Sequence, residues 1–354
     1  EAFALQGLPR PDTTTINGRR IFYSHIDGDG IVSKSHIDNK SYTGEIILRE
    51  ILQKYPTLPI TASFISGYFD MPAYQTERAE EMARAIASLP NTEVASHGHA
   101  HPLSWRKQKL ALDVPGYTYS DTAEILGSAE KINARLKKWG IDKKVSLFSW
   151  TGDCFPTEEQ TAIPAQGNLL NINGGDSRFD KRYPSYAYLY PLGIARGNSR
   201  QIYAGNANEH PYTSGWEGPF YGFQEVIETF QNTESPVRIK PINLYYHYYS
   251  GETFASLHVL KKAYDYALSQ DIFPMFASQY AALVQDFFDL QIILLPNGGT
   301  RIRNSGHLRT IRWDHETRNV NLERSRGVLG FSHFQGSLYV FLDEGKTHDI
   351  YLTN

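Results

Sequence analysis

Apolar positions along the chain fall into short runs that alternate with stretches of helical periodicity. The strand-like runs are rich in β-branched and aromatic residues, as is typical of strands buried on both faces. They cover residues 19–27, 58–66, 92–97, 144–150, 168–173, 200–205 and 241–249. The pattern therefore predicts seven strands.

Helical periodicity is clearest in residues 121–139, where apolar residues recur every three or four positions. These residues are Ile125, Ala129, Ile132, Leu136 and Trp139. Asp121 and Glu124 form a capping-box pattern at the start of this segment, and Gly140 stands where a left-handed C-terminal cap belongs. Further helices are predicted for residues 43–54, 73–88, 221–231, 252–269 and 277–288.

Strands that alternate with helices favour an α/β fold with a mostly parallel sheet. About seven such units favour a closed or nearly closed β/α barrel over an open sheet, and we place this barrel at residues 19–289, after a leader or linker at residues 1–18. Beyond residue 289, short β-prone runs are separated by Asn-Gly-Gly, Ser-Gly and Asp-Glu-Gly turn signals. Residues 290–354 are therefore predicted to form a small C-terminal antiparallel β appendage.

Composition excludes several classes of protein. The net charge of −3 comes from mixed signs without a basic stripe, so a nucleic-acid partner is not expected. No run approaches the roughly 18 apolar residues of a membrane helix, so we expect no direct membrane insertion. The lone cysteine, Cys154, excludes an internal disulfide and a thiolate-rich zinc site. The chain starts "EAFALQ", without Met or a basic leader, so we expect it to be part of a longer protein.

The segment "HIDGDG" places two aspartates directly after the first predicted strand. An EF-hand loop that started at Asp27 would need an oxygen ligand at its fifth position and glycine at its sixth. Those positions hold Ile31 and Val32, and a strand-like run precedes the loop where an EF-hand has a helix. A calcium loop is therefore excluded, which leaves a plain turn or half of a catalytic metal site.

The segment "ASHGHAHP" places three histidines after another predicted strand. Imidazoles together with a carboxylate suit a catalytic zinc or similar divalent ion. His97 and His101 are four residues apart and share one face in a helical turn, whereas in an extended segment His97, His99 and His101 would pair. The choice depends on the local geometry.

In β/α barrels the functional residues lie at the carboxyl ends of the strands. Polar residues follow five of the predicted strands, and each alone could be an ordinary cap or turn residue. Together they would converge on one rim: Asp27, Asp29, His97 to His101, Asp153, Asn173, Asp176 and His247.

Taken together, "HIDGDG", "SHGHAHP", "WTGDCFP", "NGGDS" and "YYHYYSGE" resemble the motifs of the NodB-type polysaccharide deacetylases, over roughly residues 17 to 290. Within that family they look most like the domains that modify the Pel exopolysaccharide of biofilms. The sequence departs from the usual pattern in two ways. Gly28 separates two aspartates that are usually adjacent, and "WTGDCFP" replaces the usual Arg-containing third motif, which leaves Asp153 and Asp176 as candidates for that role.

The resemblance implies a distorted (β/α)7 barrel and metal-dependent removal of N-acetyl groups from an amino-sugar polymer. Asp29, His97 and His101 would hold one divalent ion, zinc or alternatively cobalt or nickel. Asp27 would be the general base and His247 the general acid, with a backbone N–H near Trp150 to Phe155 facing the oxyanion. The resemblance also implies a periplasmic or other extracytoplasmic location, an envelope partner protein and a flanking glycoside hydrolase domain outside this chain.

Aromatic residues in "PYTSGWEGPFYGF" lie in a Gly- and Pro-rich segment, where they are either packed or in contact with saccharide. The candidate substrate contacts are Trp150, Asp153, Asp176, Tyr212, Trp216 and Tyr221. Three rival functions stay open at this point: a metal-dependent O-acetyl esterase, a degenerate polysaccharide-binding module, and a glycoside hydrolase with two carboxylates.

Overall fold

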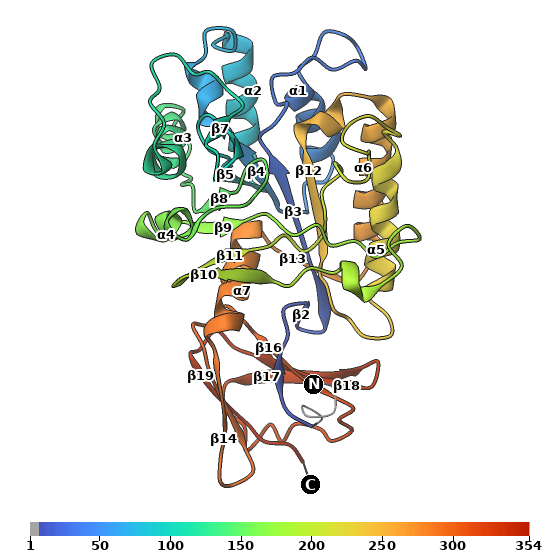
Figure 1. The fold of residues 1–354 in the computed structure, drawn as a ribbon. Coiled ribbons are helices and arrows are strands. Elements are labelled where there is room, and N and C mark those ends of the chain that lie inside the picture. The colour runs from blue at the N-terminus through green and yellow to red at the C-terminus, as the bar shows by residue number, and fades with distance from the viewer. Residues whose placement is uncertain (1–6, 354) are drawn as a thin grey trace.

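The computed structural model describes residues 7–353, and its centre is a curled sheet of parallel strands (Figure 1). The strands are hydrogen-bonded in the order β12 (Ile242–His247), β3 (Arg19–Asp27), β4 (Ile60–Phe64), β5 (Thr92–Ser96), β8 (Leu147–Ser149) and β9 (Leu170–Ile172). A seventh parallel strand, β13 (Ile272–Pro274), pairs with the first residues of β3. The sheet is a half-barrel whose path ends at β9 and β12, in agreement with the predicted barrel fold.

Helices pack on both faces of the half-barrel sheet. They are α1 (Thr43–Ile47), α2 (Glu77–Ser88), α3 (Ser128–Lys138), α4 (Glu158–Gln166), α5 (Val226–Asn232), α6 (Phe254–Leu268) and α7 (Ala277–Asp289). Helices α1 to α6 pack on the outside of the half-barrel, and α7 packs against the other face of the sheet. α1 continues as a π-helical turn (Leu48–Leu52), and another such turn (Ala123–Gly127) precedes α3. Short 3₁₀ turns occupy Ser66–Asp70, Tyr186–Tyr188, Gly222–Glu225 and Tyr248–Gly251. Every helix predicted from periodicity is present, and Gly140 has the expected positive φ of 70° after α3.

Two elements of the barrel lack a sequence signal. α4 contains Pro164 and has no apolar stripe, because buried and exposed residues are mixed around it. β13 is three residues long and its strand identity comes from pairing with β3. Neither element could be recognised from periodicity alone.

The strand predicted at 200–205 does not join the parallel sheet. It forms part of β11 (Ser199–Ile202), which pairs antiparallel with β10 (Gly193–Arg196). A two-residue Gly197-Asn198 turn connects the two strands, and a local hairpin of this kind forms without a crossover. A second small hairpin, β6 (Pro102–Ser104) with β7 (Lys109–Leu110), follows β5.

The C-terminal region is antiparallel, as predicted, and lies below the half-barrel in Figure 1. One sheet has the order β1 (Arg10–Pro11), β16 (Thr310–Asp314), β18 (Ser337–Leu342) and β17 (Val328–Phe334), and the other has the order β14 (Gln291–Leu294), β15 (Thr300–Arg303) and β19 (Thr347–Ile350). The segment expected to be a leader contributes β1 to this region and β2 (Thr15–Ile16) to β3. Residues 1–6 of that leader lie outside the described residues.

The apolar core has two parts. One lies between the sheet and helices α1 to α6. The other joins the inner face of the sheet and α7 to the C-terminal strands, with Tyr23, Tyr280 and Ile311 all buried in it. Across residues 7–353, no helix is both long enough and apolar enough to cross a bilayer.

Candidate active site

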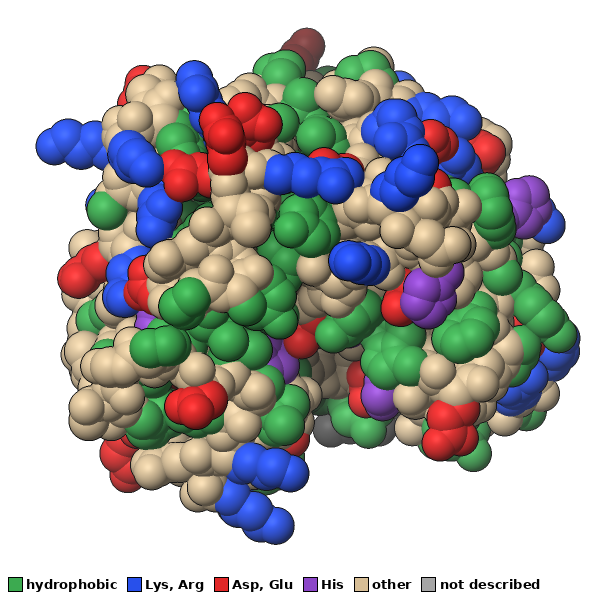
Figure 2. Space-filling model, turned by 90° about the horizontal axis from the view of Figure 1, so that it is seen from above, with side chains coloured by type: hydrophobic (Ala, Val, Ile, Leu, Met, Phe, Trp, Pro, Cys, Tyr) green, Lys and Arg blue, Asp and Glu red, His purple; other side chains and the backbone are tan. Residues whose placement is uncertain are grey.

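The carboxyl ends of β3, β5 and β12 open into a cavity of about 640 Å³. Asp27, Asp29, His97, His101 and His247 all line it. Seen from above in Figure 2, acidic and histidine side chains sit in a hollow surrounded by apolar ones. The structure thus brings together residues that are up to 220 positions apart, since β3 and β12 are neighbours in the sheet with His247 opposite Asp27.

Gly28 explains why two aspartates are separated at the end of β3. A Cβ atom at this position would come within 2.9 Å of the backbone nitrogen of Ile65. The chain therefore passes too close to the end of β4 for any side chain. This close approach lets Asp27 stay in the buried end of the strand while Asp29 sits in the next turn, partly exposed to the cavity.

The histidine loop after β5 is held by Glu124 from the turn before α3. The Glu124 carboxylate accepts N–H groups from His99 at 2.7 Å, from Ala100 at 3.0 Å and from His101 at 3.0 Å. Gly98 has a φ of +77° beside this carboxylate, and His101 itself has a left-handed φ of 56°. The expected capping role of Glu124 is therefore wrong, because its side chain anchors the loop, and Ser120 caps the helix through Ala123 N–H.

This loop is neither helical nor extended, and it sorts the three histidines. His97 and His101 point at Asp29, with Nε2 atoms 3.0 Å from its Oδ2 and Oδ1 respectively. His99 turns away and its Nδ1 lies 2.8 Å from the Ser66 hydroxyl. Of the alternatives left open by the sequence, the structure adopts the pairing of His97 with His101.

Asp29, His97 and His101 fit a divalent ion. One ligand atom from each lies within 4.8 Å of the other two. His97 Nδ1 faces the Ser149 carbonyl oxygen at 3.0 Å, so this nitrogen carries the proton and Nε2 offers its lone pair to the cavity. Two imidazoles and one carboxylate are a donor set that suits zinc and its neighbours in the first transition row.

Asp29 and His101 shift one another's protonation. Burial favours the neutral form of Asp29, but the charge of His101 and its hydrogen bond to Asp29 outweigh it and hold the pKa of Asp29 well below its usual range. Burial likewise opposes protonation of His101, and Asp29 overcomes it, so the pKa of His101 is raised. The negative charge of Asp29 that raises the pKa of His101 would also favour a bound cation.

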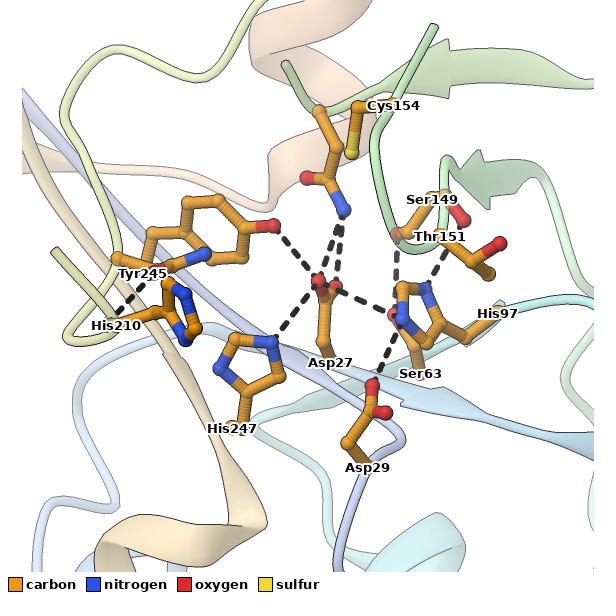
Figure 3. Close-up of polar contacts among 12 residues, drawn as sticks. Asp27, Asp29, Ser63, His97, Ser149, Thr151, Cys154, His210, Tyr245 and His247 are labelled. Atoms are coloured by element: carbon orange, nitrogen blue, oxygen red, sulfur yellow. Dashed lines mark hydrogen bonds and ion pairs between the residues drawn. The ribbon is translucent and has the colours of Figure 1, made fainter. Parts of the chain in front are cut away.

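Asp27 is buried next to His97 and Asp29 (Figure 3). It is not one of the three candidate metal ligands. Asn173 donates its Nδ2 to both Asp27 oxygens at 3.0 Å, and the Tyr245 hydroxyl donates to Oδ2 at 2.7 Å. Burial and the charge of Asp27 raise the pKa of Tyr245 well above its usual range, so the phenol keeps its proton. The carboxylate is therefore fixed in orientation by two neutral donors.

Asn173 is itself oriented from behind. Its Oδ1 lies 3.0 Å from His25 Nε2, and Asn243 Nδ2 lies 3.3 Å from His25 Nδ1. Burial lowers the pKa of His25 to about 4, so its ring is neutral. Because Asn243 donates to Nδ1, His25 must carry its proton on Nε2, and this tautomer turns the Asn173 amide group towards Asp27.

His247 faces Asp27 from the end of β12, with its Nε2 3.8 Å from Asp27 Oδ2. Its other nitrogen, Nδ1, lies 3.1 Å from the carboxylate of Glu209, which also accepts the His247 backbone N–H and the Ser250 hydroxyl. Burial opposes protonation of His247, yet the charge of Glu209 outweighs it and raises the pKa of His247 to about 10. The imidazole is therefore cationic at neutral pH.

The other expected contacts fall into two groups. Asp153, Asp176 and Trp216 line the cavity, whereas Trp150 borders it with a fully buried side chain whose indole N–H donates to Asn171. Tyr212 is fully buried under the Arg178 guanidinium, 3.8 Å from its ring centre, so it offers no surface to a sugar. Tyr221 is exposed, but it lies outside the cavity lining.

The loop from Trp150 to Phe155 was expected to offer an oxyanion donor. Trp150 N–H donates to the carbonyl of Ile172, and the N–H groups of Asp153 and Cys154 also have backbone acceptors. Phe155 N–H donates to the Asp153 side chain.

Burial raises the pKa of Cys154 well above its usual range, so this thiol stays protonated and is a poor ligand.

Several residues of the site were not assigned by sequence reasoning. Glu209 carried no motif, Glu124 was interpreted only as a helix cap, and Tyr245 and Asn173 stand in the motifs "YYHYYSGE" and "NGGDS" without an assigned role. Glu209 stands in "NANEHP", an irregular segment, and its contact with His247 spans 38 positions. A buried acid in a loop has no local signature, so these partners become visible only in the folded chain.

No protein-family model and no curated relative matches the chain. Several solved structures are similar to this chain. A Mycobacterium smegmatis protein assigned as a polysaccharide deacetylase has a TM-score of 0.50 and 14% identity, over 78% of this chain and 93% of its own. A Pseudomonas aeruginosa protein with the same assignment has a TM-score of 0.45 and 13% identity, over 74% of this chain and 88% of its own.

A third match is 4-alpha-glucanotransferase from Thermococcus litoralis, with a TM-score of 0.44 and 10% identity. It covers 73% of this chain, which spans only 38% of the length of that enzyme. At these identities the likeness is one of fold. The chain thus has the half-barrel fold found in a protein assigned as a polysaccharide deacetylase, as the NodB-type resemblance predicts.

Proposed function

We propose that this protein is a metal-dependent polysaccharide deacetylase that removes N-acetyl groups from hexosamine units. The observation that carries the proposal is the placement of Asp27. Its Oδ2 lies 3.6 Å from His97 Nε2 on the side of the metal ligands and 3.8 Å from His247 Nε2 on the other. A base, a cation site and an acid thus meet at one point of the cavity, as amide hydrolysis requires.

Asp29, His97 and His101 would hold the ion. A divalent ion at such a site polarises an amide carbonyl and lowers the pKa of a water molecule. Ser149 and Glu124 support the ligands by fixing the His97 tautomer and the loop backbone. Zinc is the expected ion, with cobalt or nickel as substitutes.

Asp27 is the general base in this proposal. Asn173 and Tyr245 donate hydrogen bonds to the Asp27 carboxylate from the protein side, so its remaining lone pairs face the cavity. It accepts the proton of the attacking water molecule as the water oxygen bonds to the acetamide carbon. Asn173 and Tyr245 donate hydrogen bonds to Asp27 without adding a charge, and Asn173 takes the orienting role for which the sequence offered Asp153 and Asp176.

His247 is the general acid. An amine leaves an amide poorly unless a proton reaches its nitrogen. The Glu209 carboxylate keeps His247 protonated, and its Nε2 proton faces the cavity. An alkoxide from an O-acetyl ester needs less help of this kind, so the Glu209–His247 pair favours amide over ester hydrolysis.

The finer assignment rests on the sequence resemblance alone. It proposes a Pel-like exopolysaccharide of the biofilm matrix as substrate and a periplasmic or other extracytoplasmic location. It also proposes an envelope partner protein and a flanking glycoside hydrolase domain outside this chain.

The decisive experiment is acetate release from an N-acetylhexosamine oligomer, with chelator and then with added zinc, cobalt or nickel. We expect release that stops on chelation and returns with metal. Release that ignores the chelator would contradict the metal-dependent mechanism. Acetate from an O-acetylated sugar but none from the N-acetylated one would indicate an esterase, and tight binding without any release would indicate a binding module.

A further inference from the structure

A second cavity, of about 350 Å³, adjoins the catalytic one. Trp216 and Tyr249 line both cavities and therefore form the wall between them. The two rings are 5.3 Å apart, and the Trp216 ring lies 5.5 Å from His247. The second cavity is thus next to the proposed general acid.

The walls of this cavity suit a sugar ring. Phe220 is exposed and adds aromatic surface, and Thr253 and Ser256 line the cavity with partly exposed hydroxyl groups. Small-molecule pockets combine apolar surface with a few polar groups in this way, and their volumes start at roughly 300 Å³. Aromatic rings bind the apolar faces of sugar rings, while hydroxyl groups bind their edges.

The cavity also carries a carboxylate without a Lys or Arg partner among residues 7–353. Glu252 is one-third exposed, and its carboxylate lies 3.8 Å from the largely exposed His36. Throughout residues 7–353, no Lys or Arg nitrogen lies within 4.0 Å of that carboxylate. Glu209, the other acid of the cavity, is already bound by His247 and Ser250. A cationic group next to Glu252, Trp216 and Tyr249 would gain from both the carboxylate and the aromatic rings.

We infer that this cavity binds the hexosamine unit next to the one being deacetylated, and that it prefers a unit whose amine is already free. This inference rests on the proposed function and deepens it. A 2-amino sugar carries the cation that Glu252 lacks, whereas an N-acetylated neighbour is neutral. The enzyme would then act best on a polymer that is already partly deacetylated.

The first test compares acetate release from two hexosamine trimers, one fully N-acetylated and one with a single free amine. We expect the wild-type kcat/KM to be about fivefold higher for the trimer with the free amine, the size of a partly screened ion pair. In Glu252→Gln this ratio should fall to about one. Glu217→Gln, which removes an exposed acid of the same region outside both cavities, should keep the wild-type ratio.

A wild-type ratio of one, or a ratio that survives in Glu252→Gln, would overturn the inference while leaving the deacetylase proposal intact. Binding provides a readout that does not need turnover. Titration of chelator-treated protein with a fully de-N-acetylated hexosamine trimer, followed by tryptophan fluorescence, should give a Kd about fivefold weaker in Glu252→Gln. An unchanged Kd would refute the inference, and loss of acetate release with an intact Kd difference would refute only the proposed reaction.

Discussion

At the scale of single residues, the site depends on neutral groups that orient charged ones. Asp27 has Asn173 and Tyr245 as donors, and His25 holds Asn173 from behind. His247 has the opposite kind of partner, since the charge of Glu209 keeps it protonated. Asp27 is thus oriented as a hydrogen-bond acceptor and His247 is kept as a donor, because their immediate neighbours differ.

The first prediction concerns Asp27. Asp27→Asn should lower kcat by about 10²- to 10⁴-fold, the usual contribution of a general base, and leave the metal content unchanged. Acetate release and metal analysis on the same preparation would measure both. The companion variant His97→Ala should lose metal and activity together. Full activity in Asp27→Asn would show that another group is the base.

The second prediction concerns the pH profile. The pKa of His247 is raised to about 10, so the acid is present below that pH and kcat/KM falls as pH rises through it. Glu209→Gln removes the charge that raises this pKa, while the burial that lowers it stays. The alkaline limb should therefore move to lower pH by at least about one unit. A bound cation would act equally on the wild type and on Glu209→Gln. An alkaline limb at the same pH in both proteins would therefore exclude His247 as the titrating acid.

At the scale of elements, the histidine loop and the turn before α3 form one functional unit. Glu124 accepts three backbone N–H groups of the loop and the hydroxyl of Tyr117. A loop with positive φ values at Gly98 and His101 needs such an anchor, because its backbone cannot pair within a strand or helix. The geometry of the proposed metal ligands therefore depends on an element that contributes none of them.

The third prediction follows from this anchor. Glu124→Gln should weaken metal affinity by about 10- to 100-fold, as is usual for groups that support the ligands. Competition with a chromophoric chelator would measure it. Glu130→Gln, which changes an exposed acid in the adjoining helix α3, is the matched control and should bind metal like the wild type. Equal affinity in both variants would mean that the loop keeps its shape without Glu124.

At the scale of the whole molecule, the half-barrel and the C-terminal strands share a core. α7 packs against both, and Asp286 on α7 accepts N–H groups from Ser305, His307 and Leu308 at 2.8 to 2.9 Å. The pairing of β1 with β16 ties the start of the chain to the same region. Because these contacts are buried, we expect the two regions to unfold together, although the division into domains remains a prediction.

The fourth prediction tests this coupling. Asp286→Ala would leave three N–H groups without an acceptor and should lower the free energy of unfolding by about 3 kcal/mol. Urea unfolding followed by circular dichroism would measure it, and both regions should be lost in one transition. Asp289→Ala, on the exposed face of the same helix, should change stability by less than about 0.5 kcal/mol.

The sequence by itself determined the features that depend on neighbours along the chain. Alternating strands and helices, the cap at Gly140 and the positions of Asp27, His97 and His247 at strand ends all follow from local patterns, because strand and helix signals extend over only a few residues. The resemblance added a consistent role for each of these residues. It did not identify the groups that orient them.

The tertiary structure decided which groups meet. Asn173 lies 146 positions from Asp27 and Glu124 lies 23 positions from His101, and no local pattern links such pairs. It also decided that β11 forms a hairpin, that Tyr212 is buried and that residues near the start of the chain pair with β16. Each outcome depends on how the chain packs against itself, since a side chain's hydrogen-bond partner and exposure are set by neighbours in space.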